Sequence, residues 1–251
     1  MIRLDWRRAA TVMVACVGLW GGTASAQPAN DRRDPWEGFN RSVFLFNGVI
    51  DHFLIKPVAE VYETVVPELA RRGVGNVLGN LGDVWSIVNL GLQGKPDKMA
   101  EMTVRVGMNT VLGIGGLFDI ATEAGLDRKS EDFGQTLAVW GVPSGPYLVL
   151  PLLGPSTLRD ASGTVVDRVA QAPLSPADEA QRWSLLGLQL TDARASALPF
   201  TRMIDQVALD KYTFVKDAYL TRRRSLVFDG TPPPEDDERD EAAPAAQGAS
   251  K

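Results

Sequence analysis

The segment that most constrains the fold of this chain is the apolar stretch at residues 96–112. From residue 99 to 112 nearly all side chains are apolar or small, and the strongly polar exceptions form one row, Glu101, Arg105 and Asn109. The spacing of four residues places this row on one face of a helix. A helix that is apolar on most of its sides must be buried or must face lipid. The chain therefore has to provide either a large core or a membrane-facing surface.

Arg105 admits two interpretations. It could pair with an acidic residue inside an ordinary core, or the polar row could line a wet passage through otherwise apolar helices. The second interpretation makes Arg105 and Asn109 candidates for contact with a polar ligand group. The sequence leaves both interpretations open.

The rest of the chain shows helical spacing interrupted by Gly and Pro. In residues 38–54, Val43, Phe46, Ile50 and Phe53 recur at helical spacing, and Asn40, Asn47 and Asp51 lie roughly opposite them. Alternation with a period of two is scarce, so we expect a nearly all-α fold. We expect helices or helical turns at residues 38–54, from 57, from 67, at 83–92, 96–112, 119–124, 132–140, from Ser156 or Thr157 to 170, at 176–193 and at 199–224.

Residues 141–155 differ from the helical segments. Prolines and glycines surround the apolar residues 147–150 in this stretch, which begins with Gly141 and Gly145 and includes Tyr147. The composition predicts a loop that buries hydrophobic side chains. We interpret it as a mobile loop with Gly141 and Gly145 as hinges.

The first 26 residues have the pattern of an export signal. Three arginines precede an apolar run that is short for a membrane span, and a small-x-small cleavage site ends at Ala26. The alternative is lipoprotein processing at Cys16, although apolar residues follow that cysteine. We expect a linker at 27–33, one domain at 34–228 and a disordered acidic tail at 229–251.

The residue inventory argues against several classes of function. The chain has one histidine and one cysteine, and it lacks a Gly-x-Ser-x-Gly elbow and a Walker loop. These residues predict no enzyme, no metal site and no cofactor. The formal net charge of −5 gives no basic excess for binding nucleic acid.

A dense set of short motifs resembles the MlaA (VacJ) family. The motifs that carry the resemblance are Asp34-Pro35 with Glu37-Gly38-Phe39-Asn40-Arg41, Phe46-Asn47, Pro57-Val58, Asn80-Leu81, Asn89, Leu92-Gln93-Gly94, Arg105, Asn109-Thr110, Leu112-Gly113, Gly115-Gly116, Asp119, Phe133-Gly134-Gln135-Thr136-Leu137, Gly141-Val142, Gly145-Pro146-Tyr147, Pro151, Gly154 and Leu158-Arg159-Asp160. They run from residue 34 to about 170, and the match is weak at 173–198.

The resemblance implies a ring-shaped helical protein in the periplasmic leaflet of the outer membrane, with an amphipathic channel. Such a protein removes misplaced phospholipid from the outer leaflet, associates with trimeric porins and passes lipid to a soluble periplasmic carrier. Asn47, Arg105 and Asn109 are then candidates for headgroup contact, and the loop with Gly141, Gly145 and Tyr147 is a candidate gate. A porin-binding scaffold that moves no lipid and a soluble lipid shuttle are the alternatives.

Overall fold

The computed structural model describes residues 33–171 and 178–233. The expected signal peptide, Cys16, residues 27–32 of the linker and the tail from 234 onward lie outside the described residues. The described elements, in chain order, are α2 (Glu37–Ile50), η1 (Asp51–Ile55), α3 (Lys56–Val65), α4 (Glu68–Leu92), α5 (Pro96–Val111), α6 (Ile120–Glu123), α7 (Phe133–Val139), β1 (Tyr147–Leu150), β2 (Gly154–Thr157), α8 (Leu158–Gln171), α9 (Glu179–Val207) and α10 (Lys211–Val227).

The first expected boundary, at Pro57, is wrong. Helix α2 passes through the π-helical turn η1 into α3, and Pro57 stands at the start of α3 without ending the helix. Proline is tolerated at the start of a helical segment, where its missing N–H costs little. The true break comes at Val66, which is extended because Pro67 follows it.

Helix α4 is longer than the sequence predicted. It starts after Pro67 and runs without interruption to Leu92, so the separate helix expected at 83–92 is only its second half. The expected stop after residue 92 is confirmed, because Gly94 has a φ of +70°. A left-handed residue at this position ends a helix, and glycine adopts it at least cost.

Pro199 was expected to begin a helix, and this prediction is also wrong. Pro199 lies inside α9. There the helix packs Ala195 and Leu198 against Ala59 of α3 in a small core. This burial holds the helix together although an interior proline costs about 3 kcal/mol. The chain breaks instead just before α10, where the Asp210 side chain accepts hydrogen bonds from the first backbone N–H groups of the helix.

Residues 147–157 form a β-hairpin where the sequence predicted a loop. Strand β1 pairs antiparallel with β2 in a register that joins Tyr147 to Thr157 and Leu150 to Gly154. Leu152 and Gly154 in and beside the turn have φ values of +65° and +83°. Thr157 then caps α8 by accepting a hydrogen bond from the Asp160 N–H at 3.2 Å. Thr157 is one of the two residues at which this helix was expected to begin.

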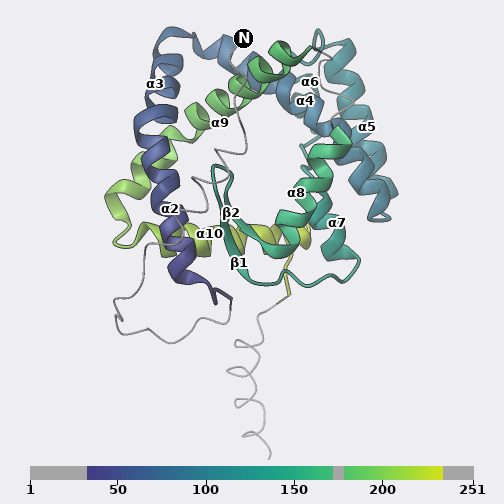
Figure 1. Ribbon diagram of the computed structural model, residues 1–251. Coiled ribbons are helices and arrows are strands. Elements are labelled where there is room, and N and C mark those ends of the chain that lie inside the picture. Colours follow the sequence, from purple (N-terminus) through teal and green to yellow (C-terminus); the bar gives the residue numbers. More distant parts are fainter. Residues whose placement is uncertain (1–32, 172–177, 234–251) are drawn as a thin grey trace, which may run out of the picture. The chain divides into compact units, whose positions relative to one another are not determined.

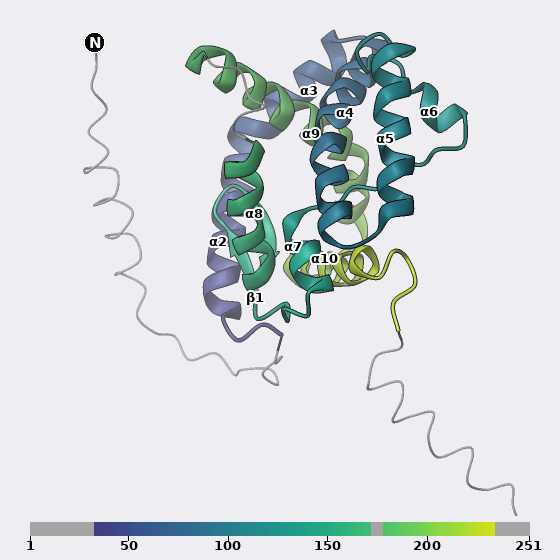
Figure 2. The ribbon, with the colours of Figure 1, turned by 90° about the vertical axis from the view of Figure 1, so that its right-hand side faces the viewer.

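Contacts between elements form a closed circuit (Figure 1). Helix α2 contacts β1, β2 contacts α8, α8 contacts α7 and α7 contacts α4; α4 contacts α9, α9 contacts α3, and α3 returns through η1 to α2. Figure 2 shows α5 beside α4, with which it makes its main contacts. The predicted all-α class is confirmed, with the hairpin as the exception within the described residues.

Candidate functional site

The described residues have an inverted distribution of polarity. Apart from glycines, the buried residues include seventeen polar or charged ones and ten hydrophobic ones. Large hydrophobic side chains are exposed on every major helix. Water-soluble proteins rarely expose apolar patches of such extent, and those that do use them to contact a partner or a membrane. This surface therefore requires an apolar environment.

The helical run from α2 to α3 shows the inversion most clearly. Phe53 is 75% exposed, Val65 72% and Leu54 62%. Residues Glu37–Val65 are the one helical segment among the described residues that is long and apolar enough to cross a membrane by length and composition. The apolar face predicted from residues 43–53 is thus largely turned outward, although Val43 packs against a buried cluster.

Arg105 lies in a buried polar cluster between α4, α5 and α6. It is 1% exposed, its Nη2 donates to Asp119 at 2.6 Å, and its Nε lies 3.6 Å from Asp83 of α4. A further donor of the guanidinium reaches the Leu126 carbonyl oxygen. The guanidinium therefore joins three separate parts of the chain.

Asn109 belongs to the same cluster. Its Nδ2 donates to Asp119 at 3.0 Å, and its Oδ1 accepts from the Ala121 N–H at 2.9 Å. Arg105 and Asn109 are thus both buried and bonded, so neither forms a water-facing row in this structure; their contact with a headgroup stays a prediction. The structure corresponds to the ion-pair alternative, because acidic partners lie on neighbouring elements. Neither side chain has a free face for a headgroup in this conformation.

The two acids of the cluster respond differently to burial. Burial raises the pKa of Asp119, but hydrogen bonds from Thr122, Arg105 and Asn109 outweigh it and lower the pKa to about 2. Burial raises the pKa of Asp83 above its ordinary value, and Arg128 and Arg105 offset only part of that effect. The two arginines therefore favour the ionised form of Asp83, which burial disfavours.

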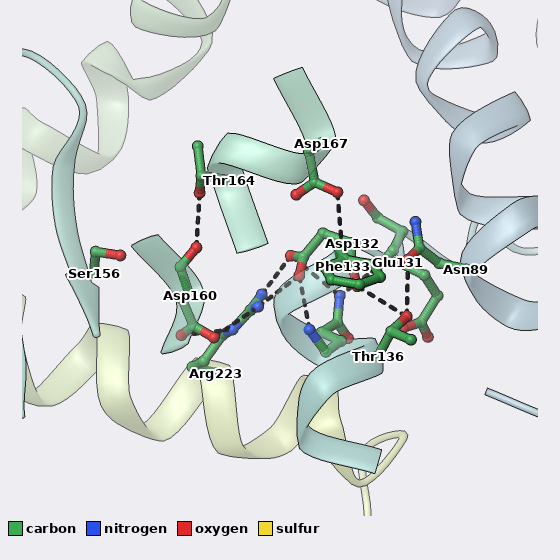
Figure 3. Close-up of polar contacts among 12 residues, drawn as sticks. Asn89, Glu131, Asp132, Phe133, Thr136, Ser156, Asp160, Thr164, Asp167 and Arg223 are labelled. Atoms are coloured by element: carbon green, nitrogen blue, oxygen red, sulfur yellow. Dashed lines mark hydrogen bonds and ion pairs between the residues drawn. The ribbon is translucent and has the colours of Figure 1, made fainter. Parts of the chain in front are cut away.

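A second, partly buried cluster joins α10 to α7 and α8 (Figure 3). Arg223 donates to Asp132 at 2.6 Å and to Asp160 at 3.0 Å. Asp132 also caps α7 by accepting from the Gln135 N–H at 2.9 Å. Burial raises the pKa of Asp132, but the Arg223 guanidinium outweighs it, so the pKa lies below its ordinary value. The cluster thus holds an ionised aspartate beneath α10.

Asp167 of α8 extends this cluster towards α4. One carboxylate oxygen accepts from the Trp85 indole N–H at 2.7 Å and from the Phe133 backbone N–H at 3.0 Å. Figure 3 shows Asp167 directed at the start of α7. These bonds fix α4, α7 and α8 relative to one another.

Two asparagines of α2 hold strand β1 by its backbone. Asn40 donates to the Tyr147 carbonyl at 3.0 Å and accepts from the Val149 N–H at 2.9 Å. Asn47 donates to the Leu150 carbonyl at 2.9 Å and accepts from the Leu152 N–H at 2.8 Å. Each amide side chain thus bonds one backbone C=O and one backbone N–H that a neighbouring strand would otherwise bond. Both bonds of Asn40 are buried, whereas one bond of Asn47 is partly buried and the other is exposed.

Tyr147 is an anchor of the hairpin. It is 1% exposed and makes edge-to-face contacts with Tyr212 and Tyr219 of α10, with ring centroids 6.3 Å and 6.2 Å apart. Asp34 lies at the same joint, where it accepts from Asn40 at 2.8 Å and from the Tyr212 hydroxyl at 2.5 Å. The hairpin base is therefore fixed to both α2 and α10.

The two candidate hinge glycines both have left-handed backbone conformations. Gly141 has a φ of +89° and Gly145 a φ of +66°. A Cβ at Gly141 would meet no atom within 4 Å, while a Cβ at Gly145 would lie 3.2 Å from the Leu158 Cβ. Both positions require glycine for conformational reasons; whether they act as hinges stays a prediction.

Sequence reasoning missed the partners that matter most. Asp132 and Arg223 lie 91 residues apart, and the bonds of Asn40 and Asn47 to β1 span more than 100 residues. The placement of the two asparagines seven residues apart on one helix face was a usable signal. Among the described residues no group of three or more His, Cys, Asp or Glu side chains could hold a metal ion.

An exposed apolar exterior, many buried polar side chains and a hairpin held by one helix are features of a protein that contacts a membrane or an apolar partner. A family model described as "MlaA lipoprotein" matches residues 32–226. The chain belongs to this family, which is one of lipid-transport lipoproteins and not of enzymes.

Named relatives agree with this assignment. The chain is 35% identical to the "Intermembrane phospholipid transport system lipoprotein MlaA" of Escherichia coli (strain K12), over 87% of this chain and 88% of that protein. It is 32% identical to the Haemophilus influenzae protein of the same name, over 88% and 90% of the two chains. An uncharacterized protein of Rickettsia prowazekii is 37% identical over 77% of this chain and 78% of its own.

A solved structure is similar as well. A chain from work described as "Structural basis for maintenance of bacterial outer membrane lipid asymmetry" aligns with a TM-score of 0.67 at 35% identity. The alignment covers 78% of this chain and all of that one.

Proposed function

We propose that this protein removes misplaced phospholipid from the outer leaflet of the outer membrane and passes it to a periplasmic carrier. It sits in the inner leaflet, associates with a trimeric porin and so maintains lipid asymmetry. The observation that carries the proposal is the inverted polarity, with apolar side chains outside and charged clusters inside. The names of the relatives from E. coli and H. influenzae support the same pathway.

The energetics of lipid transfer explain why a passage is needed. Burying one methylene group contributes about 0.8 kcal/mol, so two acyl chains of roughly 16 carbons cost on the order of 25 kcal/mol to expose to water. A headgroup is costly in hydrocarbon for the opposite reason. A passage that is polar on one side and apolar on the other lowers both costs.

We further propose that the β-hairpin gates the passage and that Asn47 is its latch. The base of the hairpin is held by the buried bonds of Asn40 and by Tyr147. Its turn carries Leu152 and Leu153, which are 60% and 57% exposed, and the bonds of Asn47 that hold it are one partly buried and one exposed. The turn can therefore open at lower cost than the base.

Lipid content tests the main proposal. The protein purified in nonionic detergent should carry phospholipid that mass spectrometry detects after extraction. Cells that lack the native gene should regain low surface phospholipid when the wild-type gene is supplied, as measured by labelling with a membrane-impermeant amine reagent. A protein that carries no lipid and fails to restore asymmetry would be a scaffold, and one that purifies without detergent would be a soluble shuttle.

The latch is tested with Asn47→Ala. The expected result is faster hydrogen exchange at Leu152 and a changed amount of surface phospholipid per folded molecule. Asn76→Ala is the matched control, since Asn76 also donates to a backbone carbonyl, that of Leu117 at 3.1 Å, but away from the hairpin. Proline at Gly141 is unsuitable because a φ of +89° excludes it. Surface phospholipid equal to that of the control, despite faster exchange, would refute the gate.

A further inference from the structure

A cavity of about 460 Å³ lies where α10 meets the start of α8 and the residues before α2 and β1. Four arginines line it: Arg33, Arg159 of α8, and Arg223 and Arg224 of α10. Among the described residues that line the cavity, the one acid is Asp217. Its volume is in the range of pockets that hold small molecules. Even with Asp132 and Asp160, which bond to Arg223 and Arg159, the arginines outnumber the acids around the cavity, and this balance favours an anion.

Two of these arginines are fixed in place before any ligand arrives. Arg159 is 9% exposed and donates to Asp160 at 3.0 Å, and Arg223 donates to Asp132 and Asp160. A guanidinium has five N–H donors, and these contacts do not use all five on either residue. Pre-ordered donors bind an anion without the entropy cost of immobilising long side chains.

One wall of the cavity is apolar. This wall is formed by Leu220 and Val227 of α10 and by Phe228, which follows the helix. A free inorganic anion would gain nothing from such a wall. A phosphodiester attached to a glycerol and acyl chains would contact both parts, because its phosphate is charged and its acyl chains are apolar. Arginine is suited to phosphate through paired N–H groups.

We propose that this cavity binds the phosphate of a phospholipid headgroup and is a stopping point for lipid that passes through the protein. The proposal rests on the proposed function and adds the place where the headgroup is held. It also assigns the headgroup contact to residues other than Arg105 and Asn109, which are enclosed.

The test is calorimetric titration of the full chain in nonionic detergent with dihexanoyl phosphatidylglycerol and, separately, with inorganic phosphate. Thr221→Glu places a negative charge in the cavity at an exposed position whose side chain has no hydrogen bond among the described contacts. Arg222→Gln is the matched control, because it changes the net charge equally at the next residue, which does not line the cavity. Arg33→Gln is a second, independent cavity variant.

We expect Thr221→Glu and Arg33→Gln to weaken lipid binding at least tenfold and Arg222→Gln to change it less than twofold. Unaltered binding in both cavity variants would overturn the proposal. Inorganic phosphate should bind at least tenfold more weakly than the lipid; equal affinity would make this a free-anion site and overturn the lipid assignment. If wild-type protein restores asymmetry while the cavity variants bind lipid normally, the cavity proposal alone fails. If wild-type protein neither carries lipid nor restores asymmetry, the proposed function fails.

Discussion

Replacing Arg105 with methionine should destabilise the protein strongly. Methionine keeps much of the length of the side chain but removes the guanidinium that joins Asp83, Asp119 and the Leu126 carbonyl. Removing one partner of a buried ion pair costs about 3–5 kcal/mol, because the remaining charge is left without compensation. For a domain of this size each kcal/mol lowers the Tm by about 2–4 °C, so the expected fall is roughly 6–20 °C.

The assay is thermal unfolding in detergent, with Arg72→Met as the matched control. Arg72 also pairs with an acid, Glu68, but the two side chains are 71% and 66% exposed. Exposed pairs contribute less than about 1 kcal/mol, so the control should change the Tm little. A Tm for Arg105→Met within the range of the control would refute the buried-pair reasoning and reopen the water-facing interpretation.

The difference in stability between the wild type and the Arg105→Met variant should depend on pH. The pKa of Asp119 is about 2 in the folded protein against an ordinary 3.8, so its ionisation stabilises the fold above pH 3.8. This contribution, about 2 kcal/mol, is lost as the pH falls through 2. In the Arg105→Met variant, Asp119 lacks the share of this stabilisation that its hydrogen bond from Arg105 provides. The difference in stability between wild type and variant should therefore narrow below pH 4, and a widening difference would contradict this account.

Two further substitutions test the hairpin joint and a close contact between α8 and α7. Asn40→Ala should cost about 2–5 kcal/mol, since it leaves two backbone groups of β1 unpaired in a buried site; Ser42→Ala, an exposed control on the same helix, should have little effect in the same denaturation assay. Gly163→Ala should lower the Tm because its Cβ would lie 2.5 Å from the backbone nitrogen of Gly134; Gly187→Ala, which meets no atom within 4 Å, should be neutral or stabilising by up to about 1 kcal/mol. An equal Tm for the two glycine variants would contradict the close-contact reasoning.

Local signals in the sequence predicted most helix boundaries and failed where tertiary contacts compete. Asp119 and Asp132 cap helices as their positions indicate, and Gly94 ends α4. Pro57 and Pro199 were misread as boundaries, because a π-helical turn and a packed interface maintain the helix past them. Local propensity is a weak prior whenever such contacts exist.

The candidate site was predicted only in part, for a similar reason. Arg105 was singled out correctly as an unusual residue, yet its environment depends on Asp83 and Asp119, which the sequence does not place beside it. The apolar face of α2 was recognised, but periodicity does not distinguish a face that packs in a core from one that faces lipid. The exposure of Phe53 shows that this part of the face does not pack in a core, and exposure is a property of the whole fold.

The motif at residues 34–41 shows why a short stretch without catalytic residues can be characteristic of a family. Asp34 binds Asn40 and the hydroxyl of Tyr212, Asn40 binds the backbone of β1, and Arg41 donates to Asp210 at 2.7 Å, where α10 begins. These polar side chains thus join α2, the hairpin and α10 through bonds that no single replacement reproduces. Since the proposed gate and the arginine cavity both depend on how the hairpin meets α10, we expect the motif to affect lipid transfer by fixing that joint.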